Sequence, residues 1–296
     1  GVGVQRLEVP ALALGEDDVE GERALAAAAH AGDHAEGVPG DAHVEVAEVV
    51  LARVPDDDLA GRGPSRPGGA GARRRRGGSA PGGRRRVPAQ RGDDFARSSA
   101  PAVQSPREFF NGLGGFADDG KQYVTVLGPG QSTPAPWINV IANPSFGFQV
   151  SAEGGGYTWS VNSRENQITP WSNDPVGDRP GEVIYLRDED SGALWCPTAL
   201  PIREETGPYI ARHGQGYSSF EHISQGISLE LLEYVPLDDS IKVCRLKVRN
   251  QSGRSRRLSI TAYVEWVLGQ SRGGTAPFIV TEVDGNSGVM LARNPW

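Results

Sequence analysis

The chain of 296 residues carries 30 basic and 37 acidic side chains, and its net charge of −7 argues against a nucleic-acid or anionic-membrane partner for the whole protein. Its two cysteines, Cys196 and Cys244, are too few for a disulfide framework, so a reducing, cytoplasmic location is the simpler interpretation. No apolar run approaches the roughly 18–20 residues of a membrane span, and no signal peptide opens the chain.

The composition changes abruptly at about Phe109. All six tryptophans, all seven tyrosines and every lysine, isoleucine, threonine and asparagine follow this position, whereas Phe95 is the one Phe, Tyr or Trp before it. Large apolar and aromatic side chains offset the entropy of ordering a backbone. We therefore expect residues 1–108 to be a low-complexity, disordered or mistranslated leader and residues 109–296 to be the folded part.

The leader is uneven in charge. Residues 1–58 hold 14 acidic side chains against 3 arginines, and residues 59–108 hold 12 arginines against 3 acids. The clusters Arg73–Arg76 and Arg84–Arg86 fit a nucleic-acid-binding patch. An unfolded linker, or an out-of-frame translation of GC-rich DNA, explains the same composition, so nucleic-acid binding ranks last among the functions that the sequence suggests.

Two stretches of the leader have local patterns. Ala24–Ala29 fits a short helix and His43–Arg53 alternates like a weak strand, but neither has a core to join. His30, His34 and His43 lack the spacing of metal ligands. The sequence predicts no metal site here.

Short strand candidates with period-two alternation fill the folded part. They are Tyr123–Leu127, Gly147–Ser151, Tyr157–Val161, Val183–Arg187, Tyr209–Arg212, Ser218–Ile223, Ile227–Val235, Phe278–Glu282 and Val289–Ala292. Glycine- and proline-rich turns separate them, and no ten-residue stretch has a helical period. The pattern predicts an all-β sandwich or barrel. Because the chain ends directly after a strand candidate, we expect the domain to be truncated at its C-terminus.

The clearest strand candidate is Leu258–Leu268, which alternates apolar and polar residues along its whole length. Ahead of it, Cys244, Leu246 and Val248 alternate with basic residues. We expect these two strands to form an antiparallel hairpin through the polar connection Asn250–Arg257. Cys244 then lies on the apolar face as a buried, inert thiol.

The stretch from Tyr157 to Asp174 contains aromatic and planar polar residues of the kind that bind sugars. Aromatic faces pack on the C–H surface of a pyranose, and Asn, Asp and Arg groups bind its hydroxyls. Arg164, Asn166, Trp171, Asn173 and Asp174 supply this set. The alternative is that Trp159 and Trp171 are core residues and that the polar side chains cap turns.

A second candidate is Arg212 with His213, which leave a strand beside two glycines. They fit an anion or a sugar hydroxyl, and a histidine can carry a proton; a structural role is the alternative. Glycoside chemistry needs carboxyl groups flanking the bond, and no linear spacing singles out such a pair. No nucleophile elbow, zinc spacing or Cys–His arrangement occurs either. The sequence therefore predicts no catalytic residue, no cofactor and no metal.

Several ordered motifs resemble the N-terminal β-domain of glycoside hydrolase family 94, formerly glycosyltransferase family 36, which contains cellobiose- and chitobiose-phosphorylase-like enzymes. The motifs are Phe110–Phe116, Thr133–Asn139, Gly154–Trp159, Thr169–Pro175, Tyr185–Asp188, Trp195–Pro197, Arg212–Tyr217 and Val235–Leu237. Four further stretches are most similar to the C-terminal phosphorylase-like region of cyclic β-1,2-glucan synthases: Asn143–Phe148, Asn162–Pro175, Ala262–Val267 and Leu291–Trp296. The resemblance covers residues 109–296 and none of the leader.

This resemblance implies an antiparallel β-supersandwich of the galactose-mutarotase-like kind. The family's catalytic centre lies in a following (α/α)6 barrel, where an Asp acts as general acid and inorganic phosphate as the inverting nucleophile. We expect that barrel beyond this chain, so no catalytic residue is carried over. Loops near the substrate mouth remain, which makes these residues glucan-proximal candidates: Arg164, Asn166, Trp171, Asn173, Asp174, Arg212 and His213.

The sequence thus predicts a non-catalytic, carbohydrate-associated fragment of a cyclic β-1,2-glucan synthase or β-glucan-phosphorylase-like enzyme. The resemblance implies β-glucan and inorganic phosphate as partners of the intact parent, through its barrel, with a homodimer and a bacterial inner-membrane anchor as further features of that parent. The alternative is a stand-alone carbohydrate-binding β-sandwich module without an enzymatic parent.

Overall fold

The computed structural model describes residues 7–9, 43–52, 108–172, 174, 176–285 and 289–295. These residues form antiparallel strands, one short helix, α2 (Arg272–Thr275), and one 3-10 turn, η1 (Ala276–Phe278). Every strand candidate named from the sequence overlaps a strand of the structure. The prediction of an all-β, antiparallel fold is confirmed.

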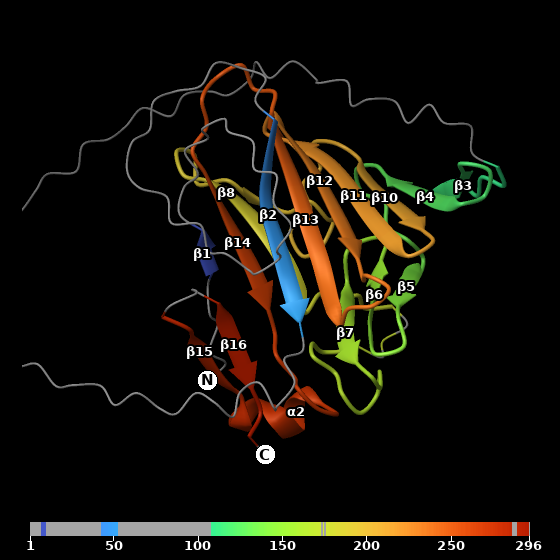
Figure 1. The fold of residues 1–296 in the computed structure, drawn as a ribbon. Helices are drawn as coiled ribbons and strands as arrows, with labels where there is room; N and C mark the ends of the chain where they lie inside the picture. The colour runs from blue at the N-terminus through green and yellow to red at the C-terminus, as the bar shows by residue number, and fades with distance from the viewer. Residues whose placement is uncertain are drawn as a thin grey trace, which may run out of the picture. The chain divides into compact units, whose positions relative to one another are not determined.

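The largest sheet has seven strands in the order β2-β13-β12-β11-β10-β4-β3 (Figure 1). All neighbours are antiparallel. The strands span His43–Ala52 (β2), Gly114–Ala117 (β3), Gln122–Leu127 (β4), Tyr209–Gly214 (β10), Tyr217–Ser224 (β11), Ile227–Tyr234 (β12) and Ile241–Asn250 (β13).

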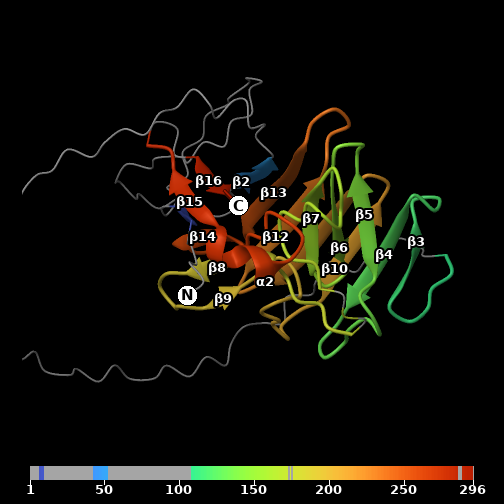
Figure 2. The same cartoon turned by 90° about the horizontal axis from the view of Figure 1, so that it is seen from below.

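Three smaller sheets complete the fold. A four-stranded sheet has the order β1-β14-β8-β9, a three-stranded sheet the order β5-β6-β7, and β15 pairs with β16. In the two views of Figures 1 and 2, β5–β7 lie beside the β10–β12 part of the large sheet. The strands span Leu7–Val9 (β1), Ile138–Ala142 (β5), Phe146–Ser151 (β6), Gly156–Ser160 (β7), Glu182–Asp188 (β8), Leu194–Trp195 (β9), Leu258–Val264 (β14), Val280–Val283 (β15) and Met290–Arg293 (β16).

One hydrophobic core joins the large sheet to the three- and four-stranded sheets. Side chains alternate between the two faces of a strand, so β12 and β13 bury one face each. Leu229 pairs with Val248 and Leu231 with Leu246 on that buried face. The same cluster contains Trp195 of β9, which is completely buried, and side chains of β6, β8 and β14. Each such leucine or valine contributes about 1.5–3 kcal/mol through burial.

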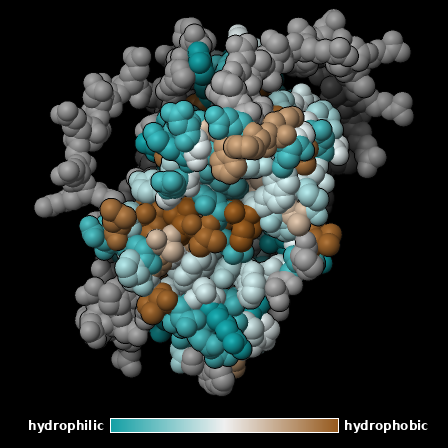
Figure 3. All heavy atoms as spheres, turned by 90° about the vertical axis from the view of Figure 1, so that its right-hand side faces the viewer, coloured by the Kyte–Doolittle hydropathy of each residue, from teal (hydrophilic) through white to brown (hydrophobic). Residues whose placement is uncertain are grey.

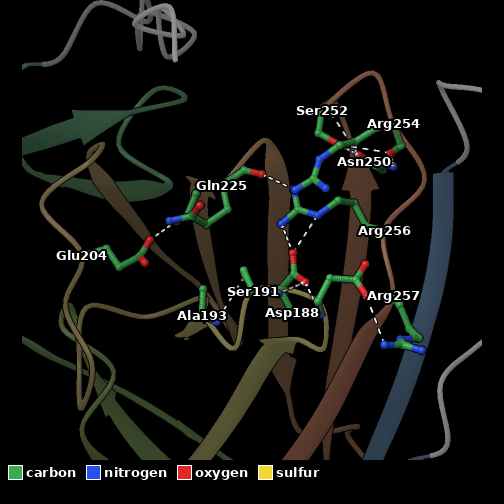
Figure 4. Close-up of polar contacts among 12 residues, drawn as sticks. Asp188, Ser191, Ala193, Glu204, Gln225, Asn250, Ser252, Arg254, Arg256 and Arg257 are labelled. Carbon is green, nitrogen blue, oxygen red and sulfur yellow. Dashed lines mark hydrogen bonds and ion pairs between the residues drawn. The ribbon is translucent and has the colours of Figure 1, made fainter. Parts of the chain in front are cut away.

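The predicted hairpin across Asn250–Arg257 is wrong. β13 belongs to the seven-stranded sheet and β14 to the four-stranded sheet, so the connection crosses between two layers. The crossing is anchored by Arg256, whose Nε donates to Oδ2 of Asp188 (2.8 Å) and whose guanidinium also donates to the carbonyl of Gln225 (Figure 4). Arg256 thus holds the connection between the two layers, with Asp188 at the end of β8 on one side and Gln225 between β11 and β12 on the other.

The strand predicted at Leu258–Leu268 is shorter than expected. β14 pairs with β8 only as far as Val264, and Ile260 is its one fully buried residue. Beyond β14 the N–H of Val267 donates to the carbonyl of Ile168 (2.9 Å), in the segment that follows β7. The backbone therefore changes partner, which alternation alone does not reveal.

The weak strand predicted at His43–Arg53 does have a sheet to join. It forms β2, which pairs with β13 from Ile241↔Ala52 to Arg249↔His43. The expectation that this stretch has no partner is therefore wrong. β2 pairs through its backbone with the edge strand β13, which does not require apolar residues nearby in the sequence. The possible helix at Ala24–Ala29 and the arginine clusters lie outside the described residues.

The described part of the chain contains no helix that is long and apolar enough to cross a membrane, since α2 has four residues.

Candidate functional site

An exposed loop follows β7 and carries most of the predicted site residues; we call residues 161–172 the β7 loop. Asn162 shapes it, because its Oδ1 accepts the N–H groups of Arg164 and Glu165 (both 2.9 Å). The carbonyl of Asn166 then accepts the N–H of Ser160 (3.0 Å), which folds the loop back onto β7. The Arg164 side chain is 87% exposed and pairs with the Glu165 carboxylate at 3.5 Å. A surface pair of this kind contributes little, so the guanidinium is available to a ligand.

Three aromatic rings form a stack at the base of this loop; we call Trp159, Tyr157 and Trp171 the aromatic stack. The Tyr157 and Trp159 ring centroids are 5.2 Å apart, and Trp171 stacks on Tyr157 at 5.8 Å with an interplanar angle of 27°. Tyr157 is buried and Trp159 half-buried, whereas Trp171 is 45% exposed. A Cβ at Gly147 would lie 2.6 Å from the Trp159 ring, so the glycine makes room for this indole. Trp171 is therefore a surface residue, contrary to the core alternative.

Gln167 ties the middle of the β7 loop to its C-terminal end through hydrogen bonds of its side chain. Its side chain is buried; Oε1 accepts the N–H of Trp171 (3.3 Å), and Nε2 donates to the carbonyls of Arg164 (3.4 Å) and Gln270 (3.2 Å). Its backbone also exchanges two hydrogen bonds with Gly269. Sequence reasoning missed this residue, because a single glutamine in a polar stretch has no distinguishing spacing.

Tyr157 adds a second link between stack and loop. Its hydroxyl donates to the carbonyl of Ser163 (3.4 Å), and burial raises the pKa of this phenol above its ordinary value. The hydroxyl consequently stays protonated and remains a donor at physiological pH.

Asp174 lies on the exposed segment just after the β7 loop. Its Oδ1 accepts the N–H of Val176 (2.9 Å), and backbone hydrogen bonds from Gly177 and Val176 lower the pKa of the carboxyl. It is an ionised, solvent-facing acceptor at neutral pH. Asn173, the other candidate in this segment, lies outside the described residues.

Arg212 and His213 lie elsewhere, on β10. The Nε of Arg212 donates to Oε1 of Glu221 on the neighbouring β11 (2.7 Å). The Nδ1 of His213 is 2.9 Å from the Ser218 hydroxyl, and its Nε2 is 3.3 Å from the carbonyl of Trp137. Burial lowers the pKa of His213 to about 4, so the ring is neutral at physiological pH. Both ring nitrogens are engaged within the sandwich.

These two residues are not brought together with the β7 loop. Their neighbour is β5, because Nδ2 of Asn139 donates to the carbonyls of Gly214 (3.0 Å) and Tyr217 (2.9 Å) at the β10–β11 turn. In the three-stranded sheet β5 and β7 are the two opposite edges. The predicted site residues thus separate into two groups, and one of them is exposed.

Between the sheets lies a buried cluster of charges that the sequence did not reveal; we call Glu182, Glu233 and Lys242 the ion cluster. The Nζ of Lys242 is 2.7 Å from Glu182 Oε2 and 3.1 Å from Glu233 Oε1. The hydroxyls of Thr158 and Thr169 donate to the other oxygen of Glu182 (2.6 and 2.5 Å). The cluster joins β8, β12 and β13, and the threonines extend it to β7 and its loop.

Electrostatics fix the charges of this cluster. Burial alone lowers the pKa of Lys242, but the two carboxylates raise it well above its usual value. Burial raises the pKa of Glu182, and the Lys242 ammonium and its hydrogen bonds more than reverse this, so the pKa is lowered. Cys244 beside them is buried, as predicted, and donates to Glu233 (3.4 Å); burial raises the pKa of its thiol well above the usual value.

The cavity beside the ion cluster has a volume of about 40 Å³ and is lined by Glu182, Glu233, Cys244, Thr198 and Tyr263 among others. This is room for a few waters, whereas ligand pockets measure several hundred cubic ångströms. No group of three or more His, Cys, Asp or Glu side chains that could hold a metal ion is found within the described ranges. The ion cluster thus links three strands in the interior beside a cavity too small for a sugar.

Comparison with known proteins confirms the family that the resemblance indicates but not its extent, because a match over 68% of this chain is longer than residues 109–296 and therefore reaches into the leader. Residues 121–296 match the supersandwich domain of glycosyl hydrolase 94. The chain is 44% identical over 201 residues to the cyclic beta-(1,2)-glucan synthase NdvB of Rhizobium meliloti (strain 1021), a match that covers 68% of this chain and 7% of that protein.

Two phosphorylases are more distant relatives. The N,N'-diacetylchitobiose phosphorylase of Vibrio proteolyticus is 31% identical over 155 residues, which is 52% of this chain and 19% of that enzyme. The solabiose phosphorylase of Paenibacillus borealis is 27% identical over 164 residues, 53% of this chain and 20% of that enzyme. The matches span between 7% and 20% of the length of these three relatives. The chain belongs to the glycosyl hydrolase 94 family, and its folded part is an antiparallel β-supersandwich of that family.

Proposed function

We propose that this chain supplies the non-catalytic, carbohydrate-associated supersandwich of a β-glucan synthase or phosphorylase-like protein. The intact parent would act on β-linked glucan by inverting phosphorolysis or glycosyl transfer, with inorganic phosphate as a partner of another part. The observation that carries this proposal is the 44% identity to a cyclic glucan synthase over 201 residues, 68% of this chain. A cytoplasmic location and a homodimeric parent belong to the same proposal.

The positions of the carboxylates support a non-catalytic role. Inverting glycoside chemistry places a general acid and a nucleophile on opposite sides of the bond. Glu182 and Glu233 instead pair with Lys242, and Asp188 pairs with Arg256, all inside the sandwich. The cavity of about 40 Å³ beside the ion cluster is far smaller than a sugar ring and its partners need.

An exposed apolar face supports a place within a larger protein. Ile138 and Val140 project from β5, an edge strand, and both are exposed. Figure 3 shows hydrophobic side chains gathered on the side of the molecule that carries β3–β5. Contiguous apolar surface of this kind is usual where another protein part packs. A parent several times longer than this chain offers such a part.

The experiment is a phosphorolysis assay with the purified chain, linear β-1,2-glucan and inorganic phosphate. We expect no sugar phosphate above the level without protein, while the NdvB relative or a chitobiose phosphorylase with its own substrate serves as the positive control. Sustained release of sugar phosphate by this chain alone would refute the proposal.

The exposed Trp171 favours a second candidate, a stand-alone carbohydrate-binding module. That function predicts tight binding of β-glucan by the isolated chain and no need for a further protein part. Deleting the apolar side chains of β5, in Ile138→Ser with Val140→Ser, separates the two. If the chain is a stand-alone module, the double variant should be more soluble and should bind β-glucan as tightly as the wild type. If the chain is a domain of a larger protein, the double variant should no longer pack against the rest of that protein.

A further inference from the structure

We infer that the outer face of Trp171 binds the pyranose rings of a β-linked glucan, with the Arg164 guanidinium beside it as a donor to sugar hydroxyls. This rests on the proposed function for the class of ligand. The binding surface consists of Trp171, backed by Tyr157, together with the exposed side chains of Arg164 and Asn166.

Trp171 exposes one face of its indole ring more than the other. One face of its indole is covered by the Tyr157 ring, at 5.8 Å between centroids and nearly parallel. The surface that Trp171 exposes, 45% for the residue as a whole, therefore lies mainly on the opposite face and the ring edge. By contrast, Trp195 is completely buried in the core, so the fold is able to bury an indole where it needs one.

Gln167 holds this surface in place before any ligand arrives. The two ends of one amide group bind the Trp171 N–H and the Arg164 carbonyl, which keeps the backbones of both residues within a single side chain's reach. The amide itself is buried and also bound to Gln270. Preorganisation of this kind lowers the entropy lost on binding and so favours a defined ligand.

The chemistry of the surface fits a neutral sugar. The π face of an indole carries negative potential and attracts the C–H groups of a pyranose face. A guanidinium and a carboxamide then offer donors and an acceptor to the ring hydroxyls. The charges nearby are balanced, since Arg164 is beside Glu165 and the Arg179 charge acts on Asp174. A phosphate-bearing ligand would need an excess of positive charge instead.

The test is isothermal titration of the full chain with a linear β-1,2-glucan oligosaccharide, compared with Trp171→Ala. The matched control is Phe116→Ala, because Phe116 is also an exposed aromatic residue (40%) packed on a tyrosine, at 5.1 Å from the Tyr123 ring. We expect Trp171→Ala to raise Kd about tenfold, the loss of one aromatic contact of about 1.4 kcal/mol. Phe116→Ala should leave Kd within about twofold, and Trp171→Phe should restore part of the affinity.

Several outcomes would overturn the inference. Equal affinity of the wild type and Trp171→Ala, both folded by circular dichroism, refutes it, and so does a complete lack of binding by the wild type. Self-association that Trp171→Ala abolishes indicates a second copy as the occupant. Each of these results leaves the phosphorolysis assay unaffected, so failure of the inference and failure of the proposed function are told apart.

Discussion

The strand surface at Arg212 and His213 and the loop surface at Arg164 and Trp171 contain the same kinds of side chain and use them differently. On β10 both side chains bind groups of the neighbouring β11: Arg212 binds the Glu221 carboxylate and His213 the Ser218 hydroxyl. On the β7 loop, hydrogen bonds go to the backbone, and the side-chain ends project into water. A strand supplies partners by register, whereas a loop fixed through its backbone leaves its side chains for a ligand.

In the ion cluster, as on β10, the side chains of strands bind one another, but here they are buried. Lys242 is almost completely buried and binds two carboxylates from two different strands. Its removal leaves Glu182 and Glu233 facing each other without a counter-charge, and the cavity beside them gives access to few waters.

The largest effect is expected for Lys242→Met. Two uncompensated buried carboxylates should lower the free energy of unfolding by about 3–5 kcal/mol, measured by urea denaturation. The control is Lys247→Met on the same strand, because Lys247 pairs with Glu230 at the surface (3.4 Å) and should cost at most about 1 kcal/mol. Similar losses in the two variants would show that the cluster is not the interior anchor described here.

Acid should destabilise the sandwich through its buried histidines. Burial lowers the pKa of His213 and of His222 to about 4 each, below the ordinary value of about 6.5. Between these values the unfolded chain binds more protons, so stability is full above pH 6.5 and falls as the pH drops toward 4. Each histidine accounts for roughly 2–3 kcal/mol across that window.

The readout is the urea midpoint from pH 7.5 to 4.5 in the wild type and in His222→Phe. The raised pKa values of Asp178 and Glu204 act in the opposite direction, so the difference between the two proteins is the decisive quantity. A steeper pH dependence in His222→Phe than in the wild type would contradict the assignment.

Gln167→Leu should affect stability and binding together. The variant loses the three side-chain hydrogen bonds of Gln167, and at about 0.5–1.5 kcal/mol per bond the loss of stability should be about 1–3 kcal/mol. Glucan affinity should fall by at least as much as in Trp171→Ala, because Trp171 and Arg164 are no longer held together. Gln251→Leu, at an exposed position away from the loop, is the control that should change neither quantity.

The smallest effects separate the two arginines. Arg164→Ala should leave stability within about 0.5 kcal/mol and weaken glucan binding about threefold. Arg212→Ala should cost about 0.5–1 kcal/mol of stability, through loss of the pair with Glu221, and leave glucan binding unchanged. The opposite pattern would place the sugar on β10 rather than on the β7 loop.

Most strands could be predicted because alternation is a local property of the chain. The partner of a strand is not local: the period-two pattern at Leu258 gives no sign that β14 pairs with β8 rather than with β13. The sequence analysis does not identify β1, β3, β5 and β9, which are short and lack a clear alternation of apolar and polar residues.

The candidate site shows the same division. Its aromatic and polar residues were visible in the sequence, and their glucan contacts stay a prediction. The sequence does not reveal which tryptophan is exposed. Trp159 is half-buried because Gly147, its partner on β6, leaves room for the indole, whereas Trp171 lies in the loop beyond β7. Gln167 was missed altogether, since its role depends on Gln270, a residue distant in the sequence.

The amide of Gln167 also sets what can replace it. Oε1 receives a hydrogen and Nε2 gives two, so a carboxylate of the same shape would point an oxygen at the carbonyls of Arg164 and Gln270. Only the protonated acid could donate there, and burial raises the pKa of such a carboxyl. An exchange of one nitrogen for one oxygen would therefore make the order of the loop depend on pH, with the loop held more firmly when the acid is protonated.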